Sequence, residues 1–111
     1  MAQDFERILK QDITLVGSPT ELRAATTTDD AIIGIRCANT SGTAVNISVY
    51  VENTSQSYFI IKDAPIPTGG SLELIDGGSK IVLQTGDSVK AYASAATSVD
   101  IITSVVDTIS A

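Results

Sequence analysis

Apolar and polar residues alternate along much of the chain, most clearly in the run from Val45 to Val51. Every second residue of this run is Val or Ile, and the residues between them are Asn, Ser and Tyr. Alternation with a period of two is typical of a β-strand that has one buried face and one solvated face. The run therefore predicts a half-buried strand.

Similar short runs precede and follow this segment, and clusters of Gly, Pro, Ser, Asn and Asp separate them. Such clusters are typical of turns, because these residues adopt or stabilise turn conformations. The first run also has the spacing of a short helix, but its β-branched end and the Gly-Ser-Pro break after it favour a strand. The predicted strands are Asp4–Val16, Glu21–Thr26, Ile33–Cys37, Val45–Val51, Tyr58–Ile61, Leu72–Leu74, Ile81–Leu83, Val89–Ala93 and Val99–Val106.

Turn residues in the second half of the chain predict local pairing. Residues 64–90 predict a ladder of antiparallel hairpins, with glycine in the turns at 76–79 and 85–87 to supply positive φ. Pro65 and Pro67 have no N–H to donate, so we expect them to end the strand before them.

Two runs are apolar on both faces, Tyr58–Ile61 and Val99–Val106. A strand of this kind is expected inside a sheet or against a neighbouring protein. By contrast, Ile33, Ile35 and Cys37 are in phase, which predicts that they share one buried face.

Eight or nine short strands without crossover helices predict an all-β fold, an antiparallel β-sandwich of about eight strands, jelly-roll or immunoglobulin-like. The 111 residues suit one domain, residues 1–111, in which residues 1–20 form either a strand or an arm that reaches a neighbour.

The net charge of −6 argues against nucleic acid as a partner, since the Lys and Arg residues are few and scattered. The first residues, with their early acids, do not have the pattern of a signal peptide. No apolar run approaches the roughly 20 residues that span a bilayer. We therefore expect a protein made in a cytoplasm, with neither nucleic acid nor membrane as a partner.

Reactive chemistry is sparse. The chain has no histidine, which excludes the usual Ser-His-Asp and Cys-His arrangements, and one cysteine, Cys37, which is expected in the core. Zinc and iron sites are disfavoured for the same reason. Loop carboxylates could bind calcium or form a glycosidase pair, and they are Asp29, Asp30, Asp63, Asp76 and Asp87. Solvation and turn capping explain these acids better, so we expect no enzyme, no metal and no cofactor.

Aromatic residues, and residues of the strands that are apolar on both faces, are the candidates for contact with a partner. Tyr50 and Tyr92 lie on the polar phase of their strands, where they either offer contact area or lie flat over their neighbours. The candidate interface residues are Phe5, Ile8, Tyr50, Tyr58, Phe59, Ile60, Tyr92, Ile102 and Val106.

One pattern of turns resembles a known group. An Asn39-Thr-Ser-Gly42 turn, a Pro65-Ile-Pro67 step and a Leu83-Gln-Thr-Gly-Asp87 turn occur in this order. Between residues 30 and 106 the chain thus resembles small β-sandwich virion proteins of tailed bacteriophages. The resemblance implies a non-enzymatic structural protein of the virion.

The role that this resemblance implies first is that of a capsid decoration (cement) protein bound to the major capsid protein on the outer head shell. A neck, tail or baseplate component is the alternative within the particle. A homo-oligomer is expected, with a trimer as the first expectation because capsid lattices offer three-fold positions. A carbohydrate-binding adhesin and a carboxylate-based hydrolase are the alternatives from other classes.

Overall fold

The structure, a computed structural model, describes residues 4–13, 15, 17–25, 29–75 and 80–107. These residues form nine strands and no helix. The strands are β1 (Asp4–Lys10), β2 (Thr20–Arg23), β3 (Asp30–Asn39), β4 (Val45–Asn53), β5 (Gln56–Ile66), β6 (Ser71–Glu73), β7 (Ile81–Leu83), β8 (Ser88–Ala93) and β9 (Val99–Asp107).

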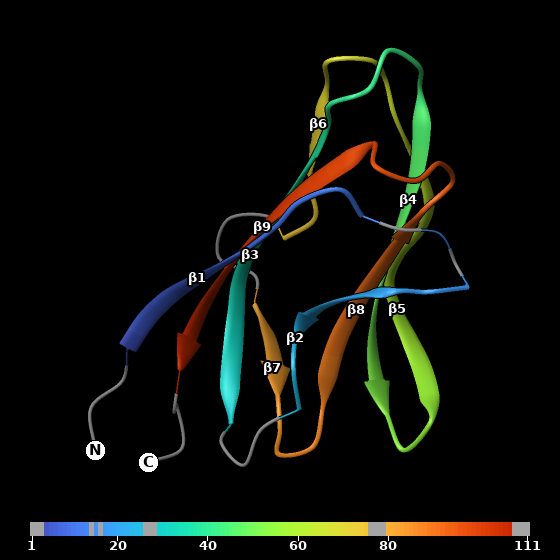
Figure 1. The fold of residues 1–111 in the computed structure, drawn as a ribbon. Helices are drawn as coiled ribbons and strands as arrows, with labels where there is room; N and C mark the ends of the chain where they lie inside the picture. The colour runs from blue at the N-terminus through green and yellow to red at the C-terminus, as the bar shows by residue number, and fades with distance from the viewer. Residues whose placement is uncertain (1–3, 14, 16, 26–28, 76–79, 108–111) are drawn as a thin grey trace.

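The strands form two antiparallel sheets (Figure 1). We call the sheet in the order β1-β9-β3-β6 sheet A, in which β7 also pairs with β3, and the sheet in the order β2-β8-β4-β5 sheet B. Successive strands mostly cross from one sheet to the other. This order is that of a jelly roll, which is built from two Greek keys. The predicted β-sandwich is confirmed, and the jelly roll is the variant observed.

The predicted ladder of hairpins is wrong. β6 and β7 both pair with β3, whereas β8 pairs with β2 and β4. Among the described strands, only β4 and β5 are consecutive in sequence and also paired. Gly86 does have the expected positive φ of 91°. Its turn, however, carries the chain from sheet A to sheet B. The predicted turn at 76–79 lies outside the described residues.

The core lies between the two sheets, and the alternation in β4 fills it as predicted. Val45, Ile47 and Val49 are buried, and Val51 packs against the core from a half-buried position. Cys37 is also fully buried, as expected. The buried cluster consists of Ile13, Leu22, Ile32, Ile35, Cys37, Val45, Ile47, Val49, Ile66, Ile75, Leu83, Val89, Ala91, Ala93, Val99, Ile101 and Val105.

β-Bulges change two of the predicted positions. The register of β3 on β9 shifts between Ile32 and Gly34, so Ile32 is buried and Ile33 faces solvent. The expectation that Ile33 shares a buried face with Ile35 and Cys37 is therefore wrong for Ile33, because one extra residue reverses the alternation.

The expectation that prolines end β5 is wrong for Pro65, because β5 continues through it to Ile66, but the strand does end before Pro67. β5 is the edge strand of sheet B, so a residue without an N–H is tolerated there. A bulge precedes it, where Asp63 has a φ of 53° and its N–H donates to the Ser48 hydroxyl at 2.9 Å.

The two strands at the chain ends pair with each other. β9 lies between β1 and β3, which confirms that its two apolar faces place it inside a sheet. β1 pairs with β9 over its whole length, from Asp4 with Asp107 to Lys10 with Ile101. Residues 4–10 are thus an edge strand of their own sheet rather than an arm.

Candidate interaction surface

The outer face of sheet A carries most of the large apolar side chains that remain exposed. The strand register sets them in rows across the sheet. One row crosses four strands through Phe5, Val106, Ala31 and Val82. Phe5 is 78% exposed and Val82 is 55% exposed.

Two further rows continue this face. Arg7, Ser104 and Gly34 form the second, and Leu9, Ile102, Arg36 and Glu73 form the third. Leu9 and Ile102 are 57% and 46% exposed, and the bulge adds Ile33 between the first two rows. We call the exposed set Phe5, Leu9, Ile33, Val82 and Ile102 the apolar face.

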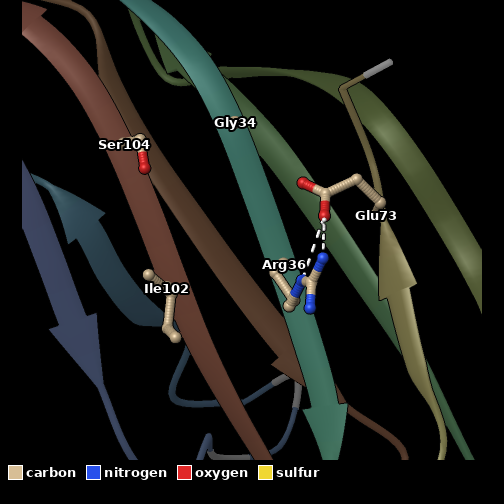
Figure 2. A pocket seen from close by; sticks show the side chains of 5 residues that line it. All are labelled: Gly34, Arg36, Glu73, Ile102 and Ser104. Atoms are coloured by element: carbon tan, nitrogen blue, oxygen red, sulfur yellow. Dashed lines mark hydrogen bonds and ion pairs between the residues drawn. The ribbon is translucent and has the colours of Figure 1, made fainter. Parts of the chain in front are cut away.

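The small residues of the middle row leave a hollow in the sheet. A depression of about 320 Å³ is lined by Gly34, Arg36, Glu73, Ile102 and Ser104. Figure 2 shows Ile102 and Ser104 on β9 and the ion pair of Arg36 with Glu73 on the other side. The carboxylate accepts from Arg36 Nε and lies 3.0 Å from Nη2, with both side chains largely exposed. The hollow thus offers apolar contact beside a solvated ion pair.

The apolar face has no activated nucleophile beneath it. Cys37 lies on β3 with its side chain on the core face, and burial raises the pKa of its thiol to about 12, with a smaller contribution from the charge of Glu73. A thiol with this pKa stays protonated near neutral pH, so it is a poor nucleophile and a poor metal ligand.

A second apolar group, the aromatic cluster of Tyr50, Phe59 and Tyr92, lies on the outer face of sheet B. The ring centroid of Tyr50 is 5.2 Å from that of Phe59 and 6.2 Å from that of Tyr92. Lys62 Nζ lies 5.1 Å from the centroid of the Phe59 ring. Tyr50 is only 6% exposed, and burial raises the pKa of its hydroxyl. The contact area of this cluster therefore comes mainly from Phe59 and Tyr92.

The remaining candidate interface residues lie apart from both groups. Tyr58 pairs with Val51, which places it on the core side of β5, yet it is 60% exposed. Ile60 is half-buried and packs against the core. Ile8 is half-buried on β1, on the opposite side of the strand from Phe5 and Leu9. The structure thus brings together Phe5, Ile102 and Val106 in one place and Tyr50, Phe59 and Tyr92 in another.

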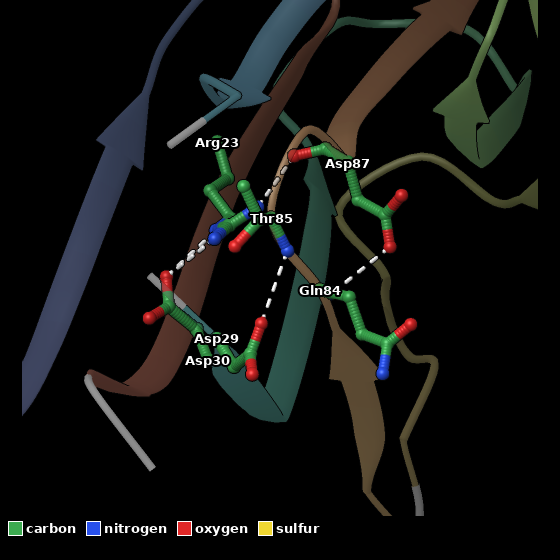
Figure 3. Close-up of polar contacts among 6 residues, drawn as sticks. All are labelled: Arg23, Asp29, Asp30, Gln84, Thr85 and Asp87. Carbon is green, nitrogen blue, oxygen red and sulfur yellow. Dashed lines mark hydrogen bonds and ion pairs between the residues drawn. The ribbon is translucent and has the colours of Figure 1, made fainter. Parts of the chain in front are cut away.

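The candidate carboxylates at one end of the sandwich belong to a structural network (Figure 3). Asp30 and Arg23 form a buried ion pair, with 2.7 Å between Asp30 Oδ2 and Arg23 Nη2. Arg23 also donates to the carbonyl of Asp87. Asp29 accepts from the Thr85 N–H at 3.0 Å.

The Asp87 carboxylate accepts from the Gln84 N–H at 2.9 Å, which confirms its predicted turn role. Its other oxygen accepts from the Asn53 amide at 2.6 Å. Within the described part of the chain, no three His, Cys, Asp or Glu side chains are grouped as metal ligands would be. Asp76 lies outside that part.

Sequence reasoning missed Leu9, Ile33 and Val82 on the apolar face and Arg23 in the polar network. A signal existed for Leu9, because Phe5, Arg7 and Leu9 are in phase along β1. A signal also existed for Val82, because it lies between Ile81 and Leu83, which share the other face of β7. None existed for Ile33, which faces solvent because of a bulge.

Fold and surface together define a small jelly-roll protein with an exposed apolar sheet face. No protein-family model matches the chain, and no curated protein matches it in sequence. A search of the described residues for a helix long and apolar enough to cross a membrane finds none.

Two solved structures are similar to this chain over most of its length. One comes from the disulfide-linked pili that Bacillus endospore appendages form, with a TM-score of 0.52, 17% identity and coverage of 98% of this chain and 88% of that chain. The other is the nucleoplasmin-like N-terminal domain of Drosophila FKBP39, with a TM-score of 0.48, 14% identity and coverage of 92% and 87%. At these identities the likeness concerns the fold alone.

Proposed function

We propose that the chain is a non-enzymatic structural subunit that assembles with other proteins through the apolar face of sheet A. The observation that carries this proposal is the exposure of Phe5, Leu9 and Ile102 on adjacent strands. A group of large apolar side chains exposed on one sheet face is unfavourable in water and usually marks an interaction surface. Covering these side chains would stabilise an assembly by about 25 cal/mol for each Å² of apolar surface removed from water.

The assembly we propose is a bacteriophage particle, with the chain as a decoration protein on the outer head shell. Its support is the resemblance of the turns at Asn39–Gly42, 65–67 and 83–87 to small phage virion proteins. The major capsid protein is then the partner, and the virion is the location. A neck, tail or baseplate position is the alternative, and it differs in having far fewer copies per particle.

The Bacillus pilus chain shows that a similar fold occurs in an extended assembly, but that pilus is disulfide-linked. Cys37 is the single cysteine of this chain and is buried. We therefore propose that any contact between copies here is non-covalent. A homo-oligomer is part of the proposal, and the trimer expected from the sequence stays a prediction.

The first experiment counts copies of the chain in purified particles by quantitative mass spectrometry. Many copies per head support decoration, a few copies support the neck or tail, and absence from particles contradicts both. The second experiment sediments the purified chain with assembled shells. Phe5→Ser is expected to weaken co-sedimentation, whereas Tyr58→Ser is expected to leave it unchanged. These variants are matched, because each removes a well-exposed ring from an edge strand.

The aromatic cluster favours a second candidate, a carbohydrate-binding adhesin. Phe59 offers a ring that is 41% exposed and stands at 90° to Tyr92. Exposed rings can pack against the apolar faces of sugars. Glycan-array binding that is lost in Phe59→Ala and Tyr92→Ala would support this candidate. A folded wild-type chain that binds no glycan would remove it.

A further inference from the structure

Edge strand β1 differs from the other sheet edges in its regular length without a bulge or a proline, so only its charged side chains discourage pairing. β6 and β7 are three residues each, and β2 has four residues and a register shift. β5 is longer but contains register shifts and Pro65. β1, by contrast, pairs with β9 over seven residues without a shift. Short length, bulges and proline are devices that protect edges, and a long regular edge is a template for another strand.

The side chains of β1 are complementary to the same strand in reverse. Glu6, Ile8 and Lys10 lie on one face of β1, with the charged residues exposed and Ile8 half-buried. When a second copy of β1 pairs antiparallel with the first around Ile8, Glu6 of each copy lies opposite Lys10 of the other. Ile8 then meets its own equivalent. Directly opposed residues in an antiparallel pair have Cβ atoms about 4.5–5.5 Å apart, which suits both contacts.

Charge also disfavours two of the other registers. A pair centred on Arg7 would oppose Arg7 to itself, and a pair centred on Glu6 would oppose two carboxylates. Like charges directly opposite each other are destabilising. On the other face of the strand, the register centred on Ile8 sets Arg7 opposite Leu9 of the second copy, which places no like charges together.

We infer that the first partner of this chain is a second copy, joined by antiparallel β1–β1 pairing around Ile8. Such a contact is two-fold symmetric and closes as a dimer. The two A sheets then form one continuous sheet, and the apolar faces of both copies lie on the same side of it. The inference rests on the proposed assembly role and adds to it a contact between copies and a dimer in place of the expected trimer.

The experiment measures the mass of the full chain in solution by sedimentation velocity across a concentration series. Wild type is expected to reach twice the 11.5 kDa of one chain. Glu6→Lys alone and Lys10→Glu alone are each expected to weaken the dimer about tenfold or more, because every 6–10 contact then joins like charges. Mixing the two variants is expected to restore a dimer, because each contact again joins an acid and a base. The matched control is Lys80→Glu, an equal charge change at an exposed residue outside β1.

Several outcomes would overturn the inference. They are a monomer at every concentration, a trimer, single variants that dimerise like wild type, and a mixture no tighter than its components. Circular dichroism of each variant shows whether it remains folded. Co-sedimentation with shells separates the two proposals. A monomer that still binds shells contradicts the dimer alone, whereas a dimer absent from particles contradicts the virion role alone.

Discussion

The hydroxyl of Thr103 is a buried polar group without a partner, and replacing it should stabilise the protein. Thr103 is fully buried in β9, where it pairs with Ile8 on one side and Ile35 on the other. Its Oγ1 has no hydrogen-bond partner among the residues that the structure describes. Thr103→Val keeps the branched shape and replaces the hydroxyl with a methyl group.

The expected gain follows from the cost of burying an unpaired hydroxyl. An unsatisfied buried polar group costs about 1–3 kcal/mol, and Thr103→Val should recover much of that free energy of unfolding. At this chain length each kcal/mol moves Tm by about 4 °C, so Tm should rise by about 4–12 °C. Urea unfolding should show a higher midpoint with the same m-value, because the exposed area on unfolding barely changes.

A matched change of opposite sign provides the control. Ser48 is also buried, but its hydroxyl accepts from the Asp63 N–H at 2.9 Å. Ser48→Ala leaves that donor at the bulge unpaired and should lower the free energy of unfolding by about 1–3 kcal/mol. If Thr103→Val lowers Tm, the hydroxyl has a partner in solution and the reasoning fails.

Two further predictions concern charge. Burial raises the pKa of the Cys37 thiol from 9.0 to about 12, so the unfolded chain loses this proton first as pH rises. The buried, neutral Cys37 thiol therefore makes its whole contribution to the free energy of unfolding below pH 9. That contribution is lost as the pH rises from 9 to 12. Chemical unfolding at several pH values should show a smaller loss over that range in Cys37→Ala, and equal losses would contradict the burial argument. Arg23→Ala leaves the buried Asp30 carboxylate without its ion pair and should destabilise the fold by about 3–5 kcal/mol, measured by thermal unfolding. Arg36→Ala is its control, because the exposed pair with Glu73 is worth about 0–1 kcal/mol.

The strands could be predicted where alternation is local and uninterrupted. β4 alternates cleanly, and β9 is apolar on both faces because one side packs on the core and the other side belongs to the outer face of sheet A. Their pairing was less predictable. Glycine-rich turns indicate where the chain reverses, but they do not distinguish a hairpin from a crossing between sheets. That is why the turn at Gly86 suggested a hairpin and instead connects β7 in sheet A to β8 in sheet B.

The candidate surface was predictable only in part, for similar reasons. Ile102 was identified because its strand is apolar on both faces, and Phe5 because it is an aromatic residue in the first predicted strand. Ile33 was assigned to the core because it is in phase with Ile35 and Cys37. A single inserted residue in β3 reverses the side to which it points. The Arg23–Asp30 pair joins the end of β2 to the start of β3, and no sequence pattern indicates that both charges would be buried together.

The burial of Cys37 gives the protein a native reporter of its own opening. It is the single thiol of the chain and lies on β3, which is held between β9 on one side and β6 and β7 on the other. A thiol reagent can reach it only when β3 separates from the rest of the sandwich, so the labelling rate measures how often that separation occurs. The same rate measured on free chain and on assembled particles would show how far assembly slows the opening of the subunit, without any added probe.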